Sequence, residues 1–197
     1  MKGFLIGVGV VVGLVVIAAL SYMGMYNGLV SKQETVNSSW SQVETDYQRR
    51  ADLIPNLVNT VKGVAKFEKE TLTDVVEARA KVGQVNLKAD DLTDPQKLQA
   101  FEQAQGRLSS ALSRLMVVVE KYPELKATGN FSELQSQLEG TENRIAVARR
   151  DFNSTVQDYN ISLRKFPTSI VAGMGGFKER AYFQAQAGSE KAPEVKF

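Results

Sequence analysis

The hydrophobic pattern begins with a long apolar run, Gly3 to Tyr26, that contains no charged residue. As a helix this run is roughly 36 Å long, and the hydrocarbon core of a bilayer is about 30 Å thick. It therefore predicts a single transmembrane helix over residues 1–26. The alternative is a cleavable signal peptide with a cleavage site at Ala19-Leu20-Ser21. The apolar core of a signal peptide is usually shorter, about 7 to 15 residues, so we favour a retained anchor.

Four glycines in this run are spaced in pairs four residues apart, Gly3 with Gly7 and Gly9 with Gly13. Small residues at this spacing let helices pack closely in lipid. They predict a homo-oligomer interface within the bilayer. The alternative, that glycine is simply common in transmembrane helices, stays open.

Charges near the run predict its orientation. Lys2 precedes the run, and the first charge after it is Lys32. The positive-inside rule then favours a cytoplasmic N-terminus and a soluble domain on the outer face of the membrane.

After Asn27 the apolar residues recur at spacings of three and four, which is typical of an amphipathic helix. The stripe is broken only by Arg50, and it predicts that the anchor helix continues, with a joint near Asn27-Gly28. Its members are Val36, Trp40, Val43, Tyr47, Ile54, Leu57, Val61 and Val64.

Three further helices are predicted downstream, over Phe67–Val85, Pro95–Lys121 and Phe131–Lys165, the last one capped by Asn130. The fold class is therefore all-α: an antiparallel bundle of about four helices over residues 27–167, packed at coiled-coil angles. Residues 168–197 are expected to form a C-terminal segment with a flexible bend at Gly173, Gly175 and Gly176, followed by a polar tail.

The C-terminal segment contains a cluster of three aromatic residues. A short helix over Phe177–Gln186 would dock Phe177, Tyr182 and Phe183 on the bundle or on a neighbouring subunit. The tail from Ala187 to Phe197 is expected to be polar and loosely held.

A proline lies inside the first long helix. Pro55 cannot donate its backbone hydrogen bond, so a kink or break is expected, and polar residues nearby are candidate partners for the freed carbonyls. These candidates are Arg49, Arg50, Asp52 and Asn56.

A second polar group lies in the last long helix and consists of Glu142, Asn143, Arg144, Arg149 and Arg150. If the two helices are antiparallel neighbours, the groups would meet in a buried network of salt bridges and amides. Such a network would fix the register of an otherwise slidable bundle.

Composition excludes several classes of function. The chain has no His and no Cys, so imidazole acid/base chemistry, thiolate nucleophiles and the usual zinc sites are absent. Lys plus Arg number 24 against 22 Asp plus Glu, which gives no electrostatic footprint for nucleic acid. We therefore expect no catalytic residue, no cofactor, no metal and no small-molecule substrate.

Several motifs resemble those of the LemA family of bacterial membrane-anchored proteins. The main one is Gln48-Arg49-Arg50-Ala51-Asp52-Leu53-Ile54-Pro55-Asn56-Leu57-Val58, preceded by Trp40-Ser41-Gln42-Val43. Others are Tyr122-Pro123-Glu124-Leu125-Lys126, Thr141-Glu142-Asn143-Arg144-Ile145-Ala146 and Tyr159-Asn160 leading to Phe166-Pro167. The resemblance implies a single-pass protein of the bacterial cytoplasmic membrane, with a membrane protease or a TPM-domain protein as a partner. It implies no catalytic activity.

Two hypotheses of function follow. The first is a non-enzymatic scaffold that is anchored in the membrane, homo-oligomerises and organises or recruits envelope proteins. The alternative is a sensor or adaptor that regulates a membrane protease or signalling partner, with Pro55 as its hinge.

Overall fold

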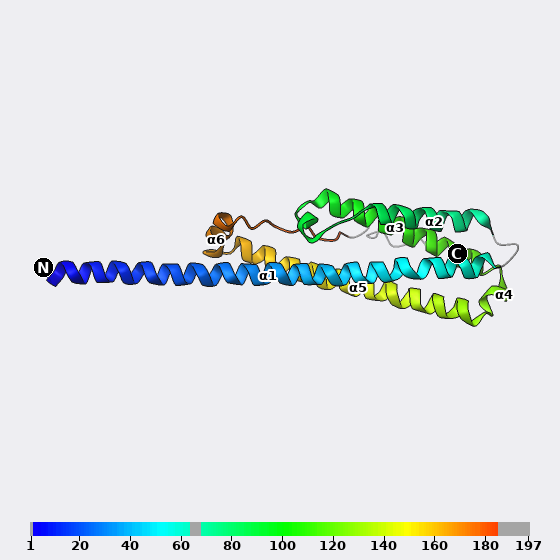
Figure 1. Cartoon of the computed structure of the whole chain (residues 1–197), viewed down its shortest axis with the longest axis horizontal. Helices are drawn as coiled ribbons and strands as arrows, with labels where there is room; N and C mark the ends of the chain where they lie inside the picture. The colour runs from blue at the N-terminus through cyan, green and yellow to red at the C-terminus, as the bar shows by residue number, and fades with distance from the viewer. Residues whose placement is uncertain (1, 64–67, 185–197) are drawn as a thin grey trace, which may run out of the picture. The chain divides into compact units, whose positions relative to one another are not determined.

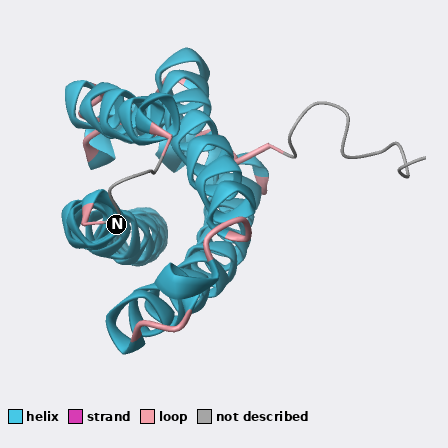
Figure 2. Cartoon of the chain, turned by 90° about the vertical axis from the view of Figure 1, so that its right-hand side faces the viewer, coloured by secondary structure: helices cyan, strands magenta, loops and turns pink. Residues whose placement is uncertain are grey.

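The structure, a computed structural model, describes residues 2–63 and 68–184 (Figure 1). Every regular element in this part of the chain is a helix (Figure 2). This confirms the all-α helical bundle with one long apolar N-terminal helix. In chain order the elements are α1 (Lys2–Lys62), α2 (Lys69–Gln84), the 3₁₀ helix η1 (Ala89–Thr93), α3 (Pro95–Val119), α4 (Pro123–Lys126), α5 (Gly129–Arg164) and α6 (Thr168–Gly175).

Helix α1 has 61 residues and is uninterrupted. It continues through Asn27-Gly28 and through Pro55, so the helix break considered at Pro55 does not occur. The reason is tertiary packing, which outweighs the local cost of one proline. The apolar stripe is buried on both sides of that position, for example at Val36, Ile54 and Leu57.

Chain contacts divide the protein into two compact units. Unit 1 consists of Met1–Asp46 and Ala146–Arg180, and unit 2 of Tyr47–Ile145 and Ala181–Phe197. Helices α1 and α5 contribute to both.

In unit 1, α1 and α5 pack in an antiparallel manner. Trp40 of α1 meets Phe152 of α5 edge-on, with ring centroids 5.6 Å apart. Earlier in α1, Tyr26 meets Phe177, which follows α5 and α6 in the chain, at 5.3 Å. Between these two contacts the residue number falls along α1 and rises in its partner segment, as expected for antiparallel packing.

In unit 2, an apolar core joins α1, α2, α3, α4 and α5. Its fully buried members include Leu57, Val75 and Leu115. Helix α3 begins as the sequence predicts: Asp94 is its N-cap and accepts hydrogen bonds from the backbone N–H groups of Gln96 and Lys97, while Pro95 occupies the first turn.

Two boundaries near the C-terminus differ from expectation. Helix α5 already includes Asn130, because it begins at Gly129, so Asn130 is not its N-cap. Helix α6 forms where a flexible glycine bend was expected, because Val171 and Ala172 are buried. It ends at Gly176, whose φ of 72° suits a residue without Cβ.

The predicted short helix over Phe177–Gln186 is wrong, because residues 177–184 have no helical structure. Their backbone polar groups bond to neighbouring elements instead of to one another. Within unit 1, Arg180 pairs with Asn160, and within unit 2 the Ala181 N–H donates to the Leu92 carbonyl over 2.8 Å. The predicted polar tail, 187–197, lies outside the described residues.

Candidate functional site

The N-terminal third of α1 presents an apolar surface that the other described residues leave exposed. Side chains from Phe4 to Leu20 are exposed, with fractions such as 77% for Phe4 and 63% for Ile17. Among the described residues, α1 is the one helix long and apolar enough to cross a membrane. Burial begins at Tyr22 and becomes complete at Leu29, which is 1% exposed.

The glycines predicted to form an oligomer interface lie on this uncovered part. A Cβ added at Gly7, Gly9 or Gly13 would meet nothing within 4 Å. Gly3 also lies in α1. The glycine faces are therefore free within one chain.

The centre of unit 2 holds a buried arginine, Arg50, which is 1% exposed. Its Nη1 donates to Ser109 Oγ and to Glu142 Oε1, each over 2.7 Å. Its Nη2 donates to the side-chain and main-chain oxygens of Gln105. The guanidinium also lies 5.1 Å from the ring centroid of Tyr47. Arg50 thus connects α1 to α3 and to α5.

The electrostatics of this cluster are those of a half-buried ion pair. Glu142 keeps 45% of its side chain exposed, whereas Arg50 is enclosed. The guanidinium loses hydration, and the carboxylate, the Ser109 hydroxyl, the Gln105 amide and the Tyr47 ring replace it. Arg50 Nε has no hydrogen-bond partner among the described residues. The cluster fixes the packing of three helices and presents no reactive group.

The other predicted members of the network lie elsewhere. Asp52 accepts from Gln48 on its own helix over 2.8 Å. Arg144 donates to Thr141, one turn away, over 2.7 Å, and Arg150 lies 3.5 Å from Asp151. The remaining predicted members are exposed or half-buried. They are Arg49, Pro55, Asn56, Asn143 and Arg149. The structure therefore brings together Arg50 and Glu142 from this set.

The carbonyl that Pro55 leaves unbonded finds a partner on another helix. The missing Pro55 N–H would have bonded to the Ala51 carbonyl, and Arg79 Nε of α2 donates to that oxygen over 3.0 Å. The expected partners were nearby residues of α1. The actual partner is 28 positions away, which sequence spacing does not indicate.

The C-terminal aromatic residues divide between the units. In unit 1, Phe177 is half-buried against Tyr26. In unit 2, Phe183 is 5% exposed, and Tyr182 is 38% exposed. Phe177 and Phe183 therefore pack on their own chain, and Tyr182 remains accessible.

Asn160 secures the C-terminal segment to α5. Its side-chain Nδ2 donates to the Arg180 carbonyl, and the Arg180 N–H donates to Asn160 Oδ1, both over 2.9 Å. The neighbouring Tyr159 is 1% exposed. Burial raises the pKa of the Tyr159 hydroxyl, and the charge of Arg180 acts in the opposite direction.

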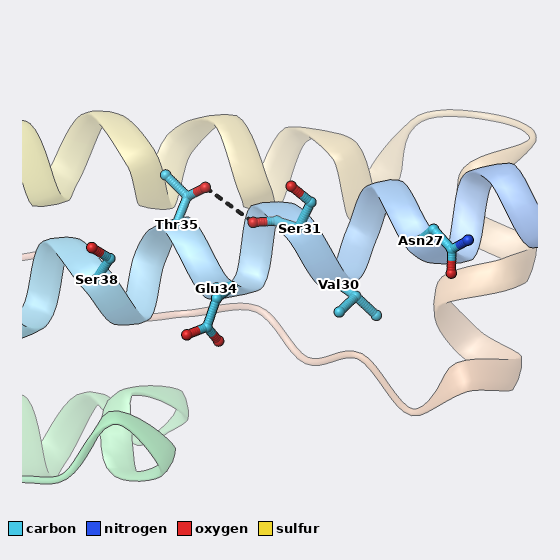
Figure 3. A pocket seen from close by; sticks show the side chains of 6 residues that line it. All are labelled: Asn27, Val30, Ser31, Glu34, Thr35 and Ser38. Atoms are coloured by element: carbon cyan, nitrogen blue, oxygen red, sulfur yellow. Dashed lines mark hydrogen bonds between the residues drawn. The ribbon is translucent and has the colours of Figure 1, made fainter.

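A polar hollow of about 600 Å³ lies along α1 just beyond the apolar run (Figure 3). Its lining side chains recur at helical spacing, and Thr35 Oγ1 donates to the Ser31 carbonyl over 3.0 Å. The hollow is lined by Asn27, Val30, Ser31, Glu34, Thr35 and Ser38. It offers hydroxyls, one amide and one carboxylate, but no group with metal-ligand spacing.

Chemistry at the remaining polar groups is limited. No group of three or more His, Cys, Asp or Glu that could hold a metal ion occurs within residues 2–63 and 68–184. Partial burial raises the pKa of Glu44, and a hydrogen bond from Trp40 acts in the opposite direction. Glu44 adjoins an aromatic pair, without a nucleophile beside it.

Several residues of these clusters were missed in the sequence. Gln105 carried a usable signal, because it is a polar residue in the apolar stripe of α3 beside Phe101 and Leu108. Arg50 shows the same signal on α1. Ser109, Arg79 and Arg180 carried none, since their roles depend on which helices become neighbours.

Comparison with known proteins identifies the family. The family model described as LemA family matches residues 39–197. The chain is 31% identical to magnetosome protein MamQ 2 of Paramagnetospirillum magneticum, across 91% of this chain and 74% of the relative. It is 25% identical to protein LemA of Metamycoplasma hominis, across 83% of this chain and 71% of that protein. Both the motifs and the matched length thus agree, and the chain belongs to the LemA family.

Proposed function

We propose that the protein is a non-enzymatic helical scaffold, anchored in the bacterial cytoplasmic membrane by α1, that self-associates and recruits other envelope proteins. One observation carries the proposal: α1 is a single helix whose first part is apolar and uncovered and whose second part is built into the helical core. An apolar helix of this length is stable in lipid, because its backbone bonds are satisfied within the helix.

The continuity of α1 favours a retained anchor over a cleaved signal peptide. Cleavage after Ser21 would cut within α1, immediately before burial begins at Tyr22. A retained segment also keeps the wholly exposed apolar surface out of water, where it would promote aggregation.

The polar clusters favour a structural role over catalysis. Arg50 is engaged with Gln105, Ser109 and Glu142, and Asn160 is engaged with the Arg180 backbone. These groups stabilise helix contacts. They leave no paired acid and base facing a cavity.

Self-association through the anchor is supported by the glycine spacing and by the free space at Gly7, Gly9 and Gly13. Recruitment is supported by the polar hollow beyond the anchor, whose serine and threonine side chains allow close approach of another helix. We extend this to a membrane protease or TPM-domain protein by family resemblance. The sensor alternative would require a bend at Pro55 within a helix that is not interrupted there.

Anchoring is tested by placing charges at the centre of the apolar run. Each arginine at a bilayer centre costs about 3 kcal/mol on an insertion scale, so Val12→Arg with Val16→Arg should shift the protein from the alkali-resistant membrane fraction to the soluble or degraded fraction. Val76→Arg with Val117→Arg, at exposed positions of α2 and α3, is the matched control. Unchanged membrane retention of the anchor variant would contradict the proposal.

Self-association is tested with Gly9→Leu and Gly13→Leu. The added side chains should separate neighbouring anchors and reduce co-purification of two differently tagged copies from native membranes. Val8→Leu with Val12→Leu adds bulk to other faces of the same helix and should have little effect. A parent protein that is monomeric by light scattering in mild detergent at micromolar concentration would remove this part of the proposal.

Recruitment is tested by photo-crosslinking from the hollow. A crosslinker at Thr35 or Ser38 should capture the same envelope protein from intact cells, and a crosslinker at Glu133 on α5 should not. Equal capture from all three positions would contradict a specific surface at the hollow.

A further inference from the structure

Helix α6 presents an apolar side that is exposed among residues 2–63 and 68–184. Ile170 is 55% exposed and Met174 is 73% exposed, and they lie four residues apart. Phe166, another four residues earlier, is 81% exposed. The opposite side of α6 is packed, since Val171 and Ala172 are 3% and 4% exposed. Thus α6 packs within unit 1 by one side, its other side exposes Ile170 and Met174, and the turn before it exposes Phe166.

The position of α6 along α1 is set by a close contact. A Cβ added at Gly175 would lie 3.2 Å from Tyr26 Cε2 and 2.7 Å from Phe177 Cε2, so the α6 backbone closely approaches both rings. Figure 1 shows α6 beside α1 at this level. Tyr22 stacks on Tyr26 with centroids 6.3 Å apart. The end of α6 therefore lies where α1 leaves its apolar run.

This level corresponds to a membrane surface if α1 spans the bilayer. About twenty helical residues cross a hydrocarbon core of about 30 Å, so a span that begins at Gly3 reaches the far interface near Tyr22. Tyrosine is enriched at that depth, because its ring is apolar and its hydroxyl is polar. Helix α6 then lies within the interfacial layer.

The residues around α6 suit that layer. The α6 sequence, TSIVAGMG, contains no charge. The flanking Lys165 and Lys178 are exposed, and their long side chains can reach lipid phosphates while the apolar side of α6 is buried. Arg164 Nε lies 3.4 Å from Glu179 Oε1, so the carboxylate of Glu179 balances the positive charge of this arginine.

We propose that α6 and the turn before it form a second membrane contact, in which Ile170 and Met174 of α6 and Phe166 of the turn insert into the bilayer surface beside the α1 anchor. The inference rests on the proposed anchoring by α1. Its occupant is lipid, because the end of α6 contacts Tyr26, where the apolar run of α1 ends, and the exposed side chains of this segment are apolar. The contact would restrict how unit 1 tilts and rotates on the membrane.

The test uses the full chain, which contains no cysteine to compete with an introduced label. The variant Ile170→Cys carries an environment-sensitive fluorophore, and the protein is reconstituted in phosphatidylcholine and phosphatidylglycerol vesicles. We expect blue-shifted emission and loss of fluorescence when the lipids carry bromine on their acyl chains. Val147→Cys and Val117→Cys, exposed apolar positions of α5 and α3, should show neither effect.

Flotation of the same vesicles distinguishes this inference from the anchoring. If the protein floats with the vesicles and residue 170 is quenched no more than residues 117 and 147, α6 is not a membrane contact and the inference is overturned. If the protein does not float, the anchoring itself fails and the inference fails with it. The variant Phe166→Ser, Ile170→Ser, Met174→Ser should still float, with greater tryptic cleavage at Lys165 and Lys178. Unchanged cleavage relative to the parent contradicts the contact.

Discussion

Pro55 and Arg79 are related through one backbone oxygen. Pro55 lacks the N–H that would bond to the Ala51 carbonyl, and Arg79 Nε donates to that carbonyl over 3.0 Å. An interior proline therefore does not interrupt α1, because a side chain from α2 supplies the missing donor. The same bond ties α2 to α1 at this point.

This relationship predicts non-additive effects of two substitutions. Arg79→Met should lower the free energy of unfolding by about 1 kcal/mol, since an exposed charged donor is lost. In a Pro55→Ala background the helix regains its own N–H, and the loss should shrink towards zero. Urea unfolding of the four proteins in mild detergent, followed by circular dichroism, measures the coupling. Additive losses would show that the two residues are independent.

Arg50 should be the most sensitive polar position of unit 2. Arg50→Met removes the donor to Ser109, Gln105 and Glu142, and it should cost about 2 to 3 kcal/mol, because the buried Gln105 oxygen loses its partner and the half-exposed Glu142 loses its counter-ion. Arg50→Lys should recover only part of the loss, since an ammonium lacks the guanidinium fork. Chemical unfolding is the measurement, and Arg49→Met, at an exposed position, is the matched control. Equal losses for the two methionine variants would contradict the buried cluster.

Asn160 should hold the extended C-terminal segment to α5. Asn160→Ala breaks two bonds with the Arg180 backbone, which should cost about 2 kcal/mol and speed tryptic cleavage after Lys178 and Arg180. Time courses of limited proteolysis report the change, with the exposed Asn143→Ala variant as the control. If cleavage after Arg180 is no faster in Asn160→Ala than in Asn143→Ala, the segment is held by other contacts.

Glu44 should make unit 1 less stable as the pH rises. Burial raises its pKa in the folded state, so the folded protein binds the proton more tightly than the unfolded chain does. Stability from this group is present below its ordinary pKa and is lost as the pH rises through the raised value. Glu44→Gln should therefore unfold at higher urea than the parent at pH 7 and at similar urea at pH 4.

The fluorescence of Trp40 gives a direct readout, because the chain contains one tryptophan. In the parent its emission should change between these pH values, and in Glu44→Gln it should stay constant. A pH dependence that persists in Glu44→Gln would assign the titration to another group.

Residue spacing along the chain was enough to predict the long apolar N-terminal helix and the other long helices. Their signals are local: the uncharged run from Gly3 to Tyr26, the apolar periodicity of α1, α3 and α5, and the Asp94-Pro95 start of α3. Arg50 was also visible, as a charge in an apolar stripe that was expected to meet a polar group containing Glu142 on the last long helix. These features follow from residue spacing, which the backbone geometry of a helix converts directly into position.

The contacts between these helices could be identified only in the folded chain. Arg79 completing α1 at Pro55, Gln105 and Ser109 enclosing Arg50, and Asn160 holding an extended segment all depend on contacts between residues far apart in the chain. The same is true of α6, whose glycines predicted a bend until burial of Val171 and Ala172 stabilised a helix. Local propensity sets the free-energy cost of each conformation, and long-range packing decides whether that cost is offset.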